Sequence, residues 1–176
     1  KLKNEELNRP TVDEFKSAEK IPLIVLLDNV RSLNNIGSVF RTCDAFAVEA
    51  LYLCGITATP PHRDIHKTAL GATESVQWKQ FKSVADAVTE LQAKKVSVLA
   101  VEQAEGAVEL DQLNIDPGRK YAVIFGNEVS GVDEQVMKIV DGAVEVPQTG
   151  TKHSLNIAVC AGVVIWQFFM KLRQPG

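Results

Sequence analysis

The chain has 176 residues, which is enough for one domain with a buried core that needs neither disulfides nor metal. Its net charge of −3 excludes a protein that attracts nucleic acid or membrane through bulk positive charge, although a local patch can still supply the field. Three cysteines without a C-x-x-C pair are expected to be reduced thiols, and neither a signal peptide nor an apolar run of spanning length is seen, so we expect a cytoplasmic protein away from membranes.

The chain begins with a charged, helix-prone arm over residues 1–20. Thr11 and Glu14 have the spacing of a capping box, and Phe15 offers one apolar anchor. Such an arm either packs on the domain or contacts a substrate, and packing is the default expectation. The remaining residues, 21–176, are expected to form a single domain.

Apolar runs in the rest of the chain alternate with helical segments. Ile21–Leu27 is continuous and rich in β-branched residues, which is typical of a strand buried on both faces. One helical segment is expected to begin after Asn34, its N-cap. Three others are expected over Ile65–Ala72, from Ser83 to Lys94 and over Asp133–Val140. The six expected strands are Ile21–Leu27, Ala50–Cys54, Val76–Phe81, Val96–Val101, Tyr121–Phe125 and Ala143–Val146. The fold class is therefore α/β, a mostly parallel six-stranded sheet with helices on both faces.

The last unit, residues 144–172, is a strand, a polar loop and a helix. Pro147 ends the strand because proline offers no N–H to the ladder. The helix is apolar nearly all round, so it cannot lie on a water-facing surface. We expect it to be enclosed between its own sheet and a second copy of the chain. A polar loop held between a buried strand and a buried helix is typical of a ligand pocket.

Three strand ends carry unusual polar content, and parallel sheets bind ligands at that edge. The first is the segment Asn29–Arg41, where Asn35 and Arg41 lie six residues apart. On spacing alone the simplest interpretation is that Asn35 caps the helix and that Arg41 forms a surface ion pair with Asp44.

The second strand end is FGNEVSG, in which Gly126 lets the backbone approach a ligand and Glu128 holds a carboxylate in the turn. It is neither a P-loop nor a G-x-G-x-x-G fingerprint, so a plain helix-entry turn is the alternative. At the third, Ser154 and Asn156 flank Leu155. Ser154 is expected as the helix N-cap, which leaves Asn156 without a capping role.

Two further patterns are weaker. His62 and His66 are four residues apart, but no third ligand is evident and the preceding prolines oppose a helix, so no metal site is expected. Arg63, His66 and Lys67 make the middle of the chain mildly basic. A solvated face is the default interpretation and a phosphate-contact strip is the alternative.

Together the three polar strand ends resemble the SpoU (TrmH-like) family of RNA ribose methyltransferases, in the SPOUT superfamily. The first motif resembles NNIGSVFRTCDAF, which carries Asn35 and Arg41, and the second resembles FGNEVSG, which carries Glu128. The third resembles VPQTGTKHSLNIAVCAGVVIW, which carries Ser154 and Asn156. The resemblance covers roughly residues 21–172, and three motifs in order are far more specific than any one of them.

The resemblance implies a deep trefoil knot in the C-terminal part of the domain and S-adenosylmethionine bound within it, largely by backbone groups. The cofactor-binding positions would be Gly126, Val146 and Leu155, with Val101 and Pro147 nearby. The resemblance further implies a homodimer packed through the final helix, and an RNA substrate, tRNA or rRNA, that is methylated on a ribose 2′-hydroxyl.

Methyl transfer needs the hydroxyl oxygen, the methyl carbon and the sulfur in line, and the hydroxyl has to lose its proton. Free arginine is a poor base, so Arg41 either takes the proton across the dimer with help from an RNA phosphate or clamps that phosphate. The residues that would orient Arg41 and the motif loops are Asn35, Glu128, Ser154 and Asn156. The competing interpretation is a catalytically silent dimer that only binds RNA or cofactor. A dehydrogenase or kinase is disfavoured because the sequence has no glycine fingerprint.

Overall fold

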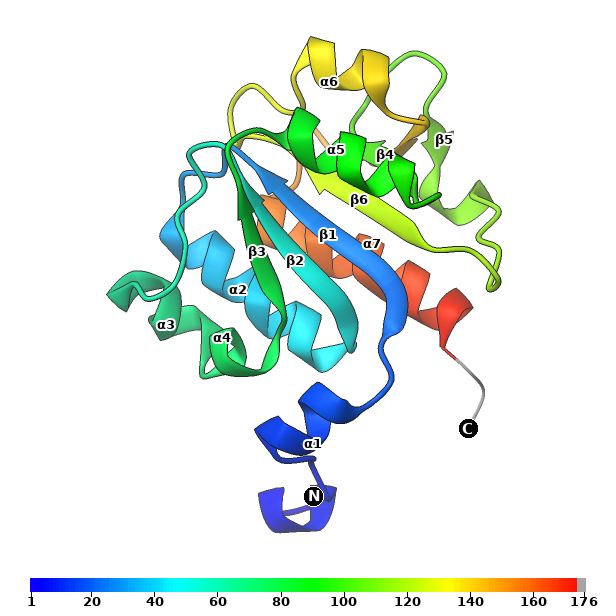
Figure 1. The fold of residues 1–176 in the computed structure, drawn as a ribbon. Coiled ribbons are helices and arrows are strands. Elements are labelled where there is room, and N and C mark those ends of the chain that lie inside the picture. The colour runs from blue at the N-terminus through cyan, green and yellow to red at the C-terminus, as the bar shows by residue number, and fades with distance from the viewer. Residues whose placement is uncertain (174–176) are drawn as a thin grey trace.

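A seven-stranded parallel sheet forms the centre of the computed structural model, which describes residues 1–173. The order of strands across the sheet is β3-β2-β1-β6-β4-β7-β5, and Figure 1 shows the sheet running through the middle of the molecule. In chain order the strands are β1 (Ile21–Asp28), β2 (Val48–Cys54), β3 (Trp78–Phe81), β4 (Ser97–Val101), β5 (Val108–Glu109), β6 (Tyr121–Phe125) and β7 (Gly142–Glu145). The expected parallel α/β class is confirmed.

The prediction of six strands was wrong by one. The additional strand, β5, has two exposed residues and pairs only with β7 at the edge of the sheet. Two residues cannot show the alternation by which a strand is recognised in a sequence. This strand therefore left no signal in the pattern of apolar residues.

Helices cover both faces of the sheet, with α5 and α6 in front and α2 and α7 behind in Figure 1. The helices are η1 (Asn4–Leu7), α1 (Val12–Ser17), α2 (Leu33–Ala45), α3 (Arg63–Ala69), α4 (Ala72–Ser75), α5 (Val84–Ala93), η2 (Leu110–Gln112), α6 (Glu134–Ile139) and α7 (Ile157–Leu172). Strand β1 serves both layers: Leu23, Val25 and Leu27 belong to the core under α2 and α7, while Ile24 and Leu26 belong to the core under α5. The continuous apolar run of this strand follows from burial on both faces.

The starts of two helices differ from the prediction. Ser32, not Asn34, caps α2, because its hydroxyl accepts a hydrogen bond from the N–H of Asn35 at 3.2 Å. Asn156, not Ser154, caps α7, because its Oδ1 accepts from the N–H groups of residues 158 and 159 at 2.9 and 3.3 Å. In both places several residues able to cap lie close together, so the sequence left the choice open. The helix expected over residues 65–72 is divided into α3 and α4, with Leu70 in the left-handed region between them.

The C-terminal helix α7 buries one side against the sheet and α2. Its buried residues are Ala161, Val164, Ile165, Phe168 and Leu172. The opposite side leaves four large apolar side chains exposed at helical spacing, namely Val159, Val163, Trp166 and Met170. We call these four residues the α7 stripe.

The N-terminal arm is helical in two short pieces. Thr11 and Glu14 form the expected capping box, with the Thr11 hydroxyl accepting from the N–H of Glu14 at 3.2 Å. The ammonium of Lys20 lies over the ring of Phe15, 4.4 Å from its centroid. Helix α1 lies beside α4 at the lower end of the molecule (Figure 1).

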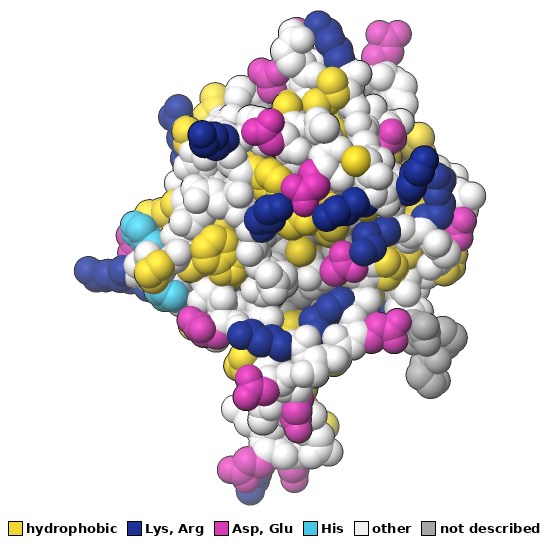
Figure 2. All heavy atoms as spheres, viewed as in Figure 1, with side chains coloured by type: hydrophobic (Ala, Val, Ile, Leu, Met, Phe, Trp, Pro, Cys, Tyr) yellow, Lys and Arg dark blue, Asp and Glu magenta, His cyan; other side chains and the backbone are white. Residues whose placement is uncertain are grey.

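The surface shown in Figure 2 carries Lys and Arg side chains interspersed with Asp and Glu side chains. No broad region of one sign of charge appears on this side. Among residues 1–173, none of the helices has the length and apolar character needed to cross a membrane.

The sheet changes its direction of winding between β1 and β6. The chain builds β2 and β3 on one side of β1, while β6, β4 and β7 lie on the other side. In open α/β sheets, ligands bind at such a switch point, outside the carboxyl ends of the strands. The residues that follow β1, β4, β6 and β7 meet at this edge.

Substitution of Gly37 tests the close packing of α2 against α3. A β-carbon at this position would lie 2.1 Å from Thr68 Oγ1 and 2.2 Å from the carbonyl oxygen of Ile65. We expect Gly37→Ala to lower the free energy of unfolding by about 2–3 kcal/mol, measured by urea denaturation. The matched control is Gly150→Ala in the loop before α7, where an added β-carbon meets nothing within 4 Å. The control should gain roughly 0.4–1 kcal/mol because alanine restricts the unfolded chain. Equal effects of the two substitutions would contradict the proposed contact.

Candidate functional site

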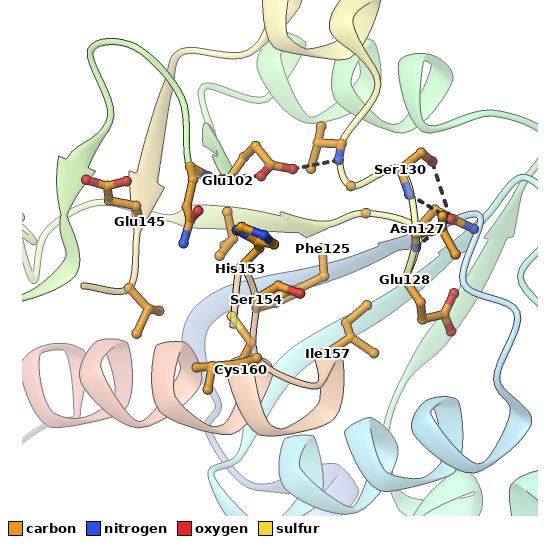
Figure 3. Close-up of a pocket in the computed structure, with 18 of the residues that line it drawn as sticks. Glu102, Phe125, Asn127, Glu128, Ser130, Glu145, His153, Ser154, Ile157 and Cys160 are labelled. Atoms are coloured by element: carbon orange, nitrogen blue, oxygen red, sulfur yellow. Dashed lines mark hydrogen bonds between the residues drawn. The ribbon is translucent and has the colours of Figure 1, made fainter. Parts of the chain in front are cut away.

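A cavity of about 720 Å³ opens at the carboxyl edge of the sheet, beside the switch point. Four chain segments that are distant in sequence line it: the ends of β4, β6 and β7, and the loop and first turns that lead into α7. Figure 3 shows Glu102 and Glu145 on the sheet side and Ser154, Ile157 and Cys160 on the α7 side. The size and the mixture of apolar and polar lining are typical of a site for a small organic ligand.

The turn after β6 forms one wall of this cavity. Asn127 organises it, since its Oδ1 accepts from the N–H groups of Val129 and Ser130 at 2.9 and 3.1 Å. Gly126 has no room for a side chain, because a β-carbon there would lie 2.2 Å from the carbonyl carbon of Gly131. Gly131 adopts a φ of +68°, a conformation that glycine reaches without strain. Gly126, which was predicted as a ligand-approach position, thus also allows the turn to close on itself, together with Gly131.

Glu128 joins this turn to the loop that follows β1. Its carboxylate accepts hydrogen bonds from the N–H of Arg31, at 3.1 Å to each oxygen, and from the N–H of Ser32 at 2.9 Å. Partial burial raises the pKa of Glu128, but hydrogen bonds from the backbone of Ser32, Arg31 and Glu128 itself and from the Asn35 side chain outweigh burial, so the net pKa lies below the ordinary value. The group is therefore an ionised anchor and a poor proton acceptor.

The first and third predicted motifs touch directly. Asn156 Nδ2 donates a hydrogen bond to Asn35 Oδ1 at 3.3 Å, across 121 positions of sequence. Asn156 lines the cavity as well, and so does Ser154, which is exposed. Four of the five predicted catalytic positions, Asn35, Glu128, Ser154 and Asn156, therefore lie at or beside one cavity.

The fifth predicted catalytic position, Arg41, lies elsewhere in the same chain. It is exposed on α2 and is not among the residues that line the cavity. Six residues of α-helix turn Arg41 roughly 120° away from Asn35 around the axis. The simple alternative, an ion pair with Asp44, was wrong, because within residues 1–173 the Asp44 carboxylate instead accepts a hydrogen bond from the Ser75 hydroxyl.

Four of the five predicted cofactor positions line the cavity: Val101, Gly126, Val146 and Leu155. Pro147 does not line it, and its exposed ring lies between two residues that do. Proline ends β7 there and cannot donate a backbone hydrogen bond, so its contribution is to the path of the chain.

Sequence reasoning missed the charge of the cavity. The lining contains the four carboxylates of Glu102, Glu128, Glu134 and Glu145, and it contains neither lysine nor arginine. Glu102 follows directly after β4 and accepts from the N–H of Val132 at 2.9 Å, which ties the end of β4 to the turn after β6. The strand-end rule that found the other three segments would have found Glu102, had it been applied to β4 as well.

No three His, Cys, Asp or Glu side chains within residues 1–173 are grouped so that they could hold a metal ion. The paired histidines have other contacts. His62 caps α3, with its Nδ1 accepting from the N–H of Asp64 at 3.2 Å, and His66 Nδ1 lies 3.5 Å from Thr73 Oγ1. Arg63 and Lys67 are exposed, and Lys67 forms an ion pair with Asp64 at 3.2 Å.

A second feature missed from sequence is Asp28, the last residue of β1. Only 4% of its surface is exposed. Burial and the neighbouring charge of Asp133 raise the pKa of Asp28 from 3.8 to about 6. A carboxylate that is ionised at neutral pH in such a place costs stability.

The match to known proteins covers most of the chain. Residues 22–166 match the model of the SpoU rRNA Methylase family. A tRNA (guanosine(18)-2′-O)-methyltransferase of Thermus thermophilus is 29% identical over 162 residues, which are 92% of this chain and 81% of the relative.

Two solved structures have similar folds. The A. aeolicus TrmH/SpoU tRNA modifying enzyme superposes with a TM-score of 0.80 at 22% identity, over 91% of this chain and 80% of the other. The AdoMet-bound rRNA methyltransferase of Sinorhizobium meliloti gives a TM-score of 0.80 at 24% identity, over 94% of this chain and 62% of the other.

The pKa of Asp28 predicts a pH dependence of stability. Because the pKa of Asp28 is higher in the folded protein than the ordinary value, ionisation of its carboxyl favours the unfolded chain. The folded state therefore loses stability as the pH rises from 3.8 through about 6. The wild type should therefore lose about 2–3 kcal/mol relative to Asp28→Asn between about pH 4 and pH 7, with the difference level above that range. Urea denaturation of both proteins across this range measures the difference. A difference that does not change with pH would contradict the raised pKa.

Proposed function

Because the chain belongs to the SpoU rRNA methylase family, we propose that it is an S-adenosylmethionine-dependent RNA methyltransferase that modifies a ribose 2′-hydroxyl of tRNA or rRNA. The observation that carries this proposal is the meeting of three distant segments around one cavity. Asn35 contacts Asn156, and Glu128 holds the loop that leads to Asn35. The relatives named above act on tRNA and rRNA, and they give no reason to choose between these substrates.

The cavity suits S-adenosylmethionine in size and charge. Its volume of about 720 Å³ lies within the range of cofactor sites. Val101, Val146 and Leu155 offer apolar surface, while Glu102 and Glu145 are acidic residues of the same lining. A negative lining without lysine or arginine favours a cationic ligand. When bound, the cofactor supplies an electrophilic methyl group on a positively charged sulfur.

The residues of this chain serve mainly to align the reacting groups and less to accept a proton. Glu128 is held ionised by backbone N–H groups and has no free role as a base. Its task is to fix the start of α2, from which Asn35 reaches Asn156. Asn156 also caps α7, so the position of its side chain is tied to that of the helix. An in-line displacement depends on such fixed geometry.

We propose that Arg41 acts on a neighbouring subunit's cavity. It is exposed on α2, turned away from Asn35, and is not among the residues that line the cavity of its own chain, which supports a role in the cavity of a partner. From a partner, its guanidinium can hold an RNA phosphate with two hydrogen bonds and take up the hydroxyl proton with help from that phosphate. Both roles need Arg41 at the same place beside the RNA. The two roles differ in how much activity Arg41→Lys retains, since lysine keeps the positive charge but lacks the planar guanidinium that makes two parallel hydrogen bonds.

The α7 stripe supports a homodimer. Val159 and Trp166 are 55% and 48% exposed. Exposing apolar side chains of this size to water is costly, and polar residues could have occupied this side of the helix. The ring of Trp166 packs edge-on against Phe46 at the end of α2, 5.5 Å between centroids. An interface over the stripe therefore lies next to the helix that carries Arg41.

Two finer parts of the proposal follow from the family. The C-terminal segment that carries Val146, Leu155 and α7 would form the trefoil knot, with the cofactor held between its loops. The compartment would be the cytoplasm, where tRNA and rRNA are available. We further propose that residues 1–20 act as an arm separate from the knotted domain over residues 21–176.

A catalytically silent RNA or cofactor-binding dimer is the competing function. It has less support, because a protein that only binds has no use for the joined asparagines Asn35 and Asn156 beside an anchored Glu128. Transfer of tritiated methyl groups to bulk RNA separates the two functions. Incorporation into RNA that is resistant to alkali at the modified position supports 2′-O-methylation, and failure of both transfer and cofactor binding would contradict the proposed function.

Substitution of Arg41 separates chemistry from cofactor binding. We expect Arg41→Ala to lower the methyl-transfer rate by about 10²–10⁴-fold, because it removes either the proton acceptor or the phosphate clamp. Cofactor affinity, measured by calorimetry, should stay close to that of the wild type. A parallel loss of cofactor affinity would contradict the assigned role.

Mixed dimers test whether Arg41 acts across subunits. Leu155→Arg places a long side chain in the cavity from an exposed position, so it should block cofactor binding without disturbing the core. A dimer of one Arg41→Ala chain and one Leu155→Arg chain keeps one complete site only if Arg41 acts in trans. Random mixing of the two inactive variants should then restore about a quarter of wild-type activity. No restoration would place Arg41 in the site of its own chain.

A further inference from the structure

Glu102 lines the cavity but has no part in the proposed alignment of the reacting groups. It follows directly after β4 and is half-buried. Both oxygens of its carboxylate are held by the backbone, since Oε1 accepts from the N–H of Gln103 and Oε2 accepts from the N–H of Val132, each at 2.9 Å. Hydrogen bonds to a charged acceptor are strong, so they keep the negative charge of Glu102 at one place in the wall of the cavity.

The turn after β6 is shaped to admit this carboxylate. A β-carbon at Gly131 would lie 2.2 Å from Glu102 Oε2, so a side chain at Gly131 would displace the carboxylate. Two glutamates thus hold the turn, with Glu102 bound to its far end at Val132 and Glu128 bound to the loop before α2. The charge of Glu128 is directed to the start of α2, whereas that of Glu102 lies between the end of β4 and the turn, both of which line the cavity.

The negative charge of Glu102 acts as far as α7, which forms the other side of the cavity. Cys160 of α7 is in the lining, and Figure 3 shows it on the α7 side and Glu102 on the sheet side. Burial raises the pKa of the Cys160 thiol to about 11, and the charge of Glu102 contributes to this rise. A field that disfavours a thiolate on α7 also favours a positive charge within the same cavity.

We propose that Glu102 makes the cavity prefer the positively charged methyl donor over its neutral product, S-adenosylhomocysteine. The inference rests on the proposed function and adds the residue that distinguishes the two ligands. Methyl transfer breaks the carbon–sulfur bond and forms a carbon–oxygen bond, while the sulfur keeps the bonding electron pair and loses its positive charge. The hydroxyl proton passes to the acceptor that Arg41 and the RNA phosphate would provide. Donor and product therefore differ by one methyl group and one unit of charge, and a carboxylate in the wall acts on the charge.

Such a preference favours turnover, because donor and product compete for the same cavity. The neutral product gains no attraction from Glu102, so it is displaced more readily by the charged donor. Other glutamates of the lining are less suited to this role. The charge of Glu128 is engaged by backbone N–H groups, and Glu134 is exposed at the start of α6, where water and salt screen its charge. Glu102 is half-buried and held at both oxygens, which preserves its field.

The test is calorimetric titration of the whole chain with S-adenosylmethionine and, separately, with S-adenosylhomocysteine. Glu102→Gln keeps the length of the side chain and an oxygen that can accept from the N–H of Val132, and it removes the charge. We expect the Kd of S-adenosylmethionine to rise about 3- to 10-fold in this variant, while the Kd of S-adenosylhomocysteine stays within about twofold. The matched control is Glu109→Gln, an exposed position on β5 outside the lining, which should change neither Kd. A loss of preference in Glu145→Gln as large as that in Glu102→Gln would overturn the assignment to Glu102.

A second variant separates the charge of Glu102 from its support of the turn. Glu102→Asp keeps the charge but is one methylene too short to hold both N–H groups, so it should weaken the two ligands by a similar factor and leave the ratio of their Kd values unchanged. Equal weakening of both ligands in Glu102→Gln overturns the proposal, because Glu102 then only supports the turn. A wild type that binds donor and product equally overturns it without any variant. A wild type that binds neither ligand would instead overturn the proposed function.

Discussion

The architecture of the site depends on one carboxylate that meets the backbone of a segment 97 positions away in sequence. Glu128 accepts the N–H groups of Arg31 and Ser32, the last residues before α2 begins. These N–H groups lie at the positive end of the helix and have no partner within it, so a negative side chain both satisfies and stabilises them. The same contact lowers the pKa of Glu128, so its carboxylate is a poor proton acceptor.

Much of the fold could be read from the order of residues, because its causes are local. The unbroken apolar run of β1 reflects burial on two faces, and the capping box of Thr11 needs only residues three apart. The cavity was predictable for a related reason: parallel strands place their carboxyl ends at one edge, so polar residues after β1, β6 and β7 had to converge. The resemblance to a known family then identified which of these residues belong together.

The features that could not be predicted from the sequence depend on contacts that produce no periodic pattern of residues. The two residues of β5 pair only because β7 offers an edge, and the caps of α2 and α7 depend on which of several polar side chains the loop geometry admits. The orientation of Arg41 illustrates a different limit. Sequence order places it in the first motif with Asn35, yet helix geometry turns it away from Asn35 and it does not line the cavity, which the proposed contribution from a neighbouring subunit would explain.

The charges around the site impose a further condition on how RNA approaches. Glutamates line the cavity without any lysine or arginine among them, so it favours cations and hydrogen-bond donors and repels phosphate. A negative ribose-phosphate chain can reach such a site only if cations stand at the rim, outside the cavity itself. Arg31, exposed in the loop just before α2, is one such cation, and Arg41 would be another when supplied by a partner. The net negative charge is thus compatible with the proposed RNA binding, because the cavity interior suits a cationic methyl donor while a few exposed arginines would hold the backbone.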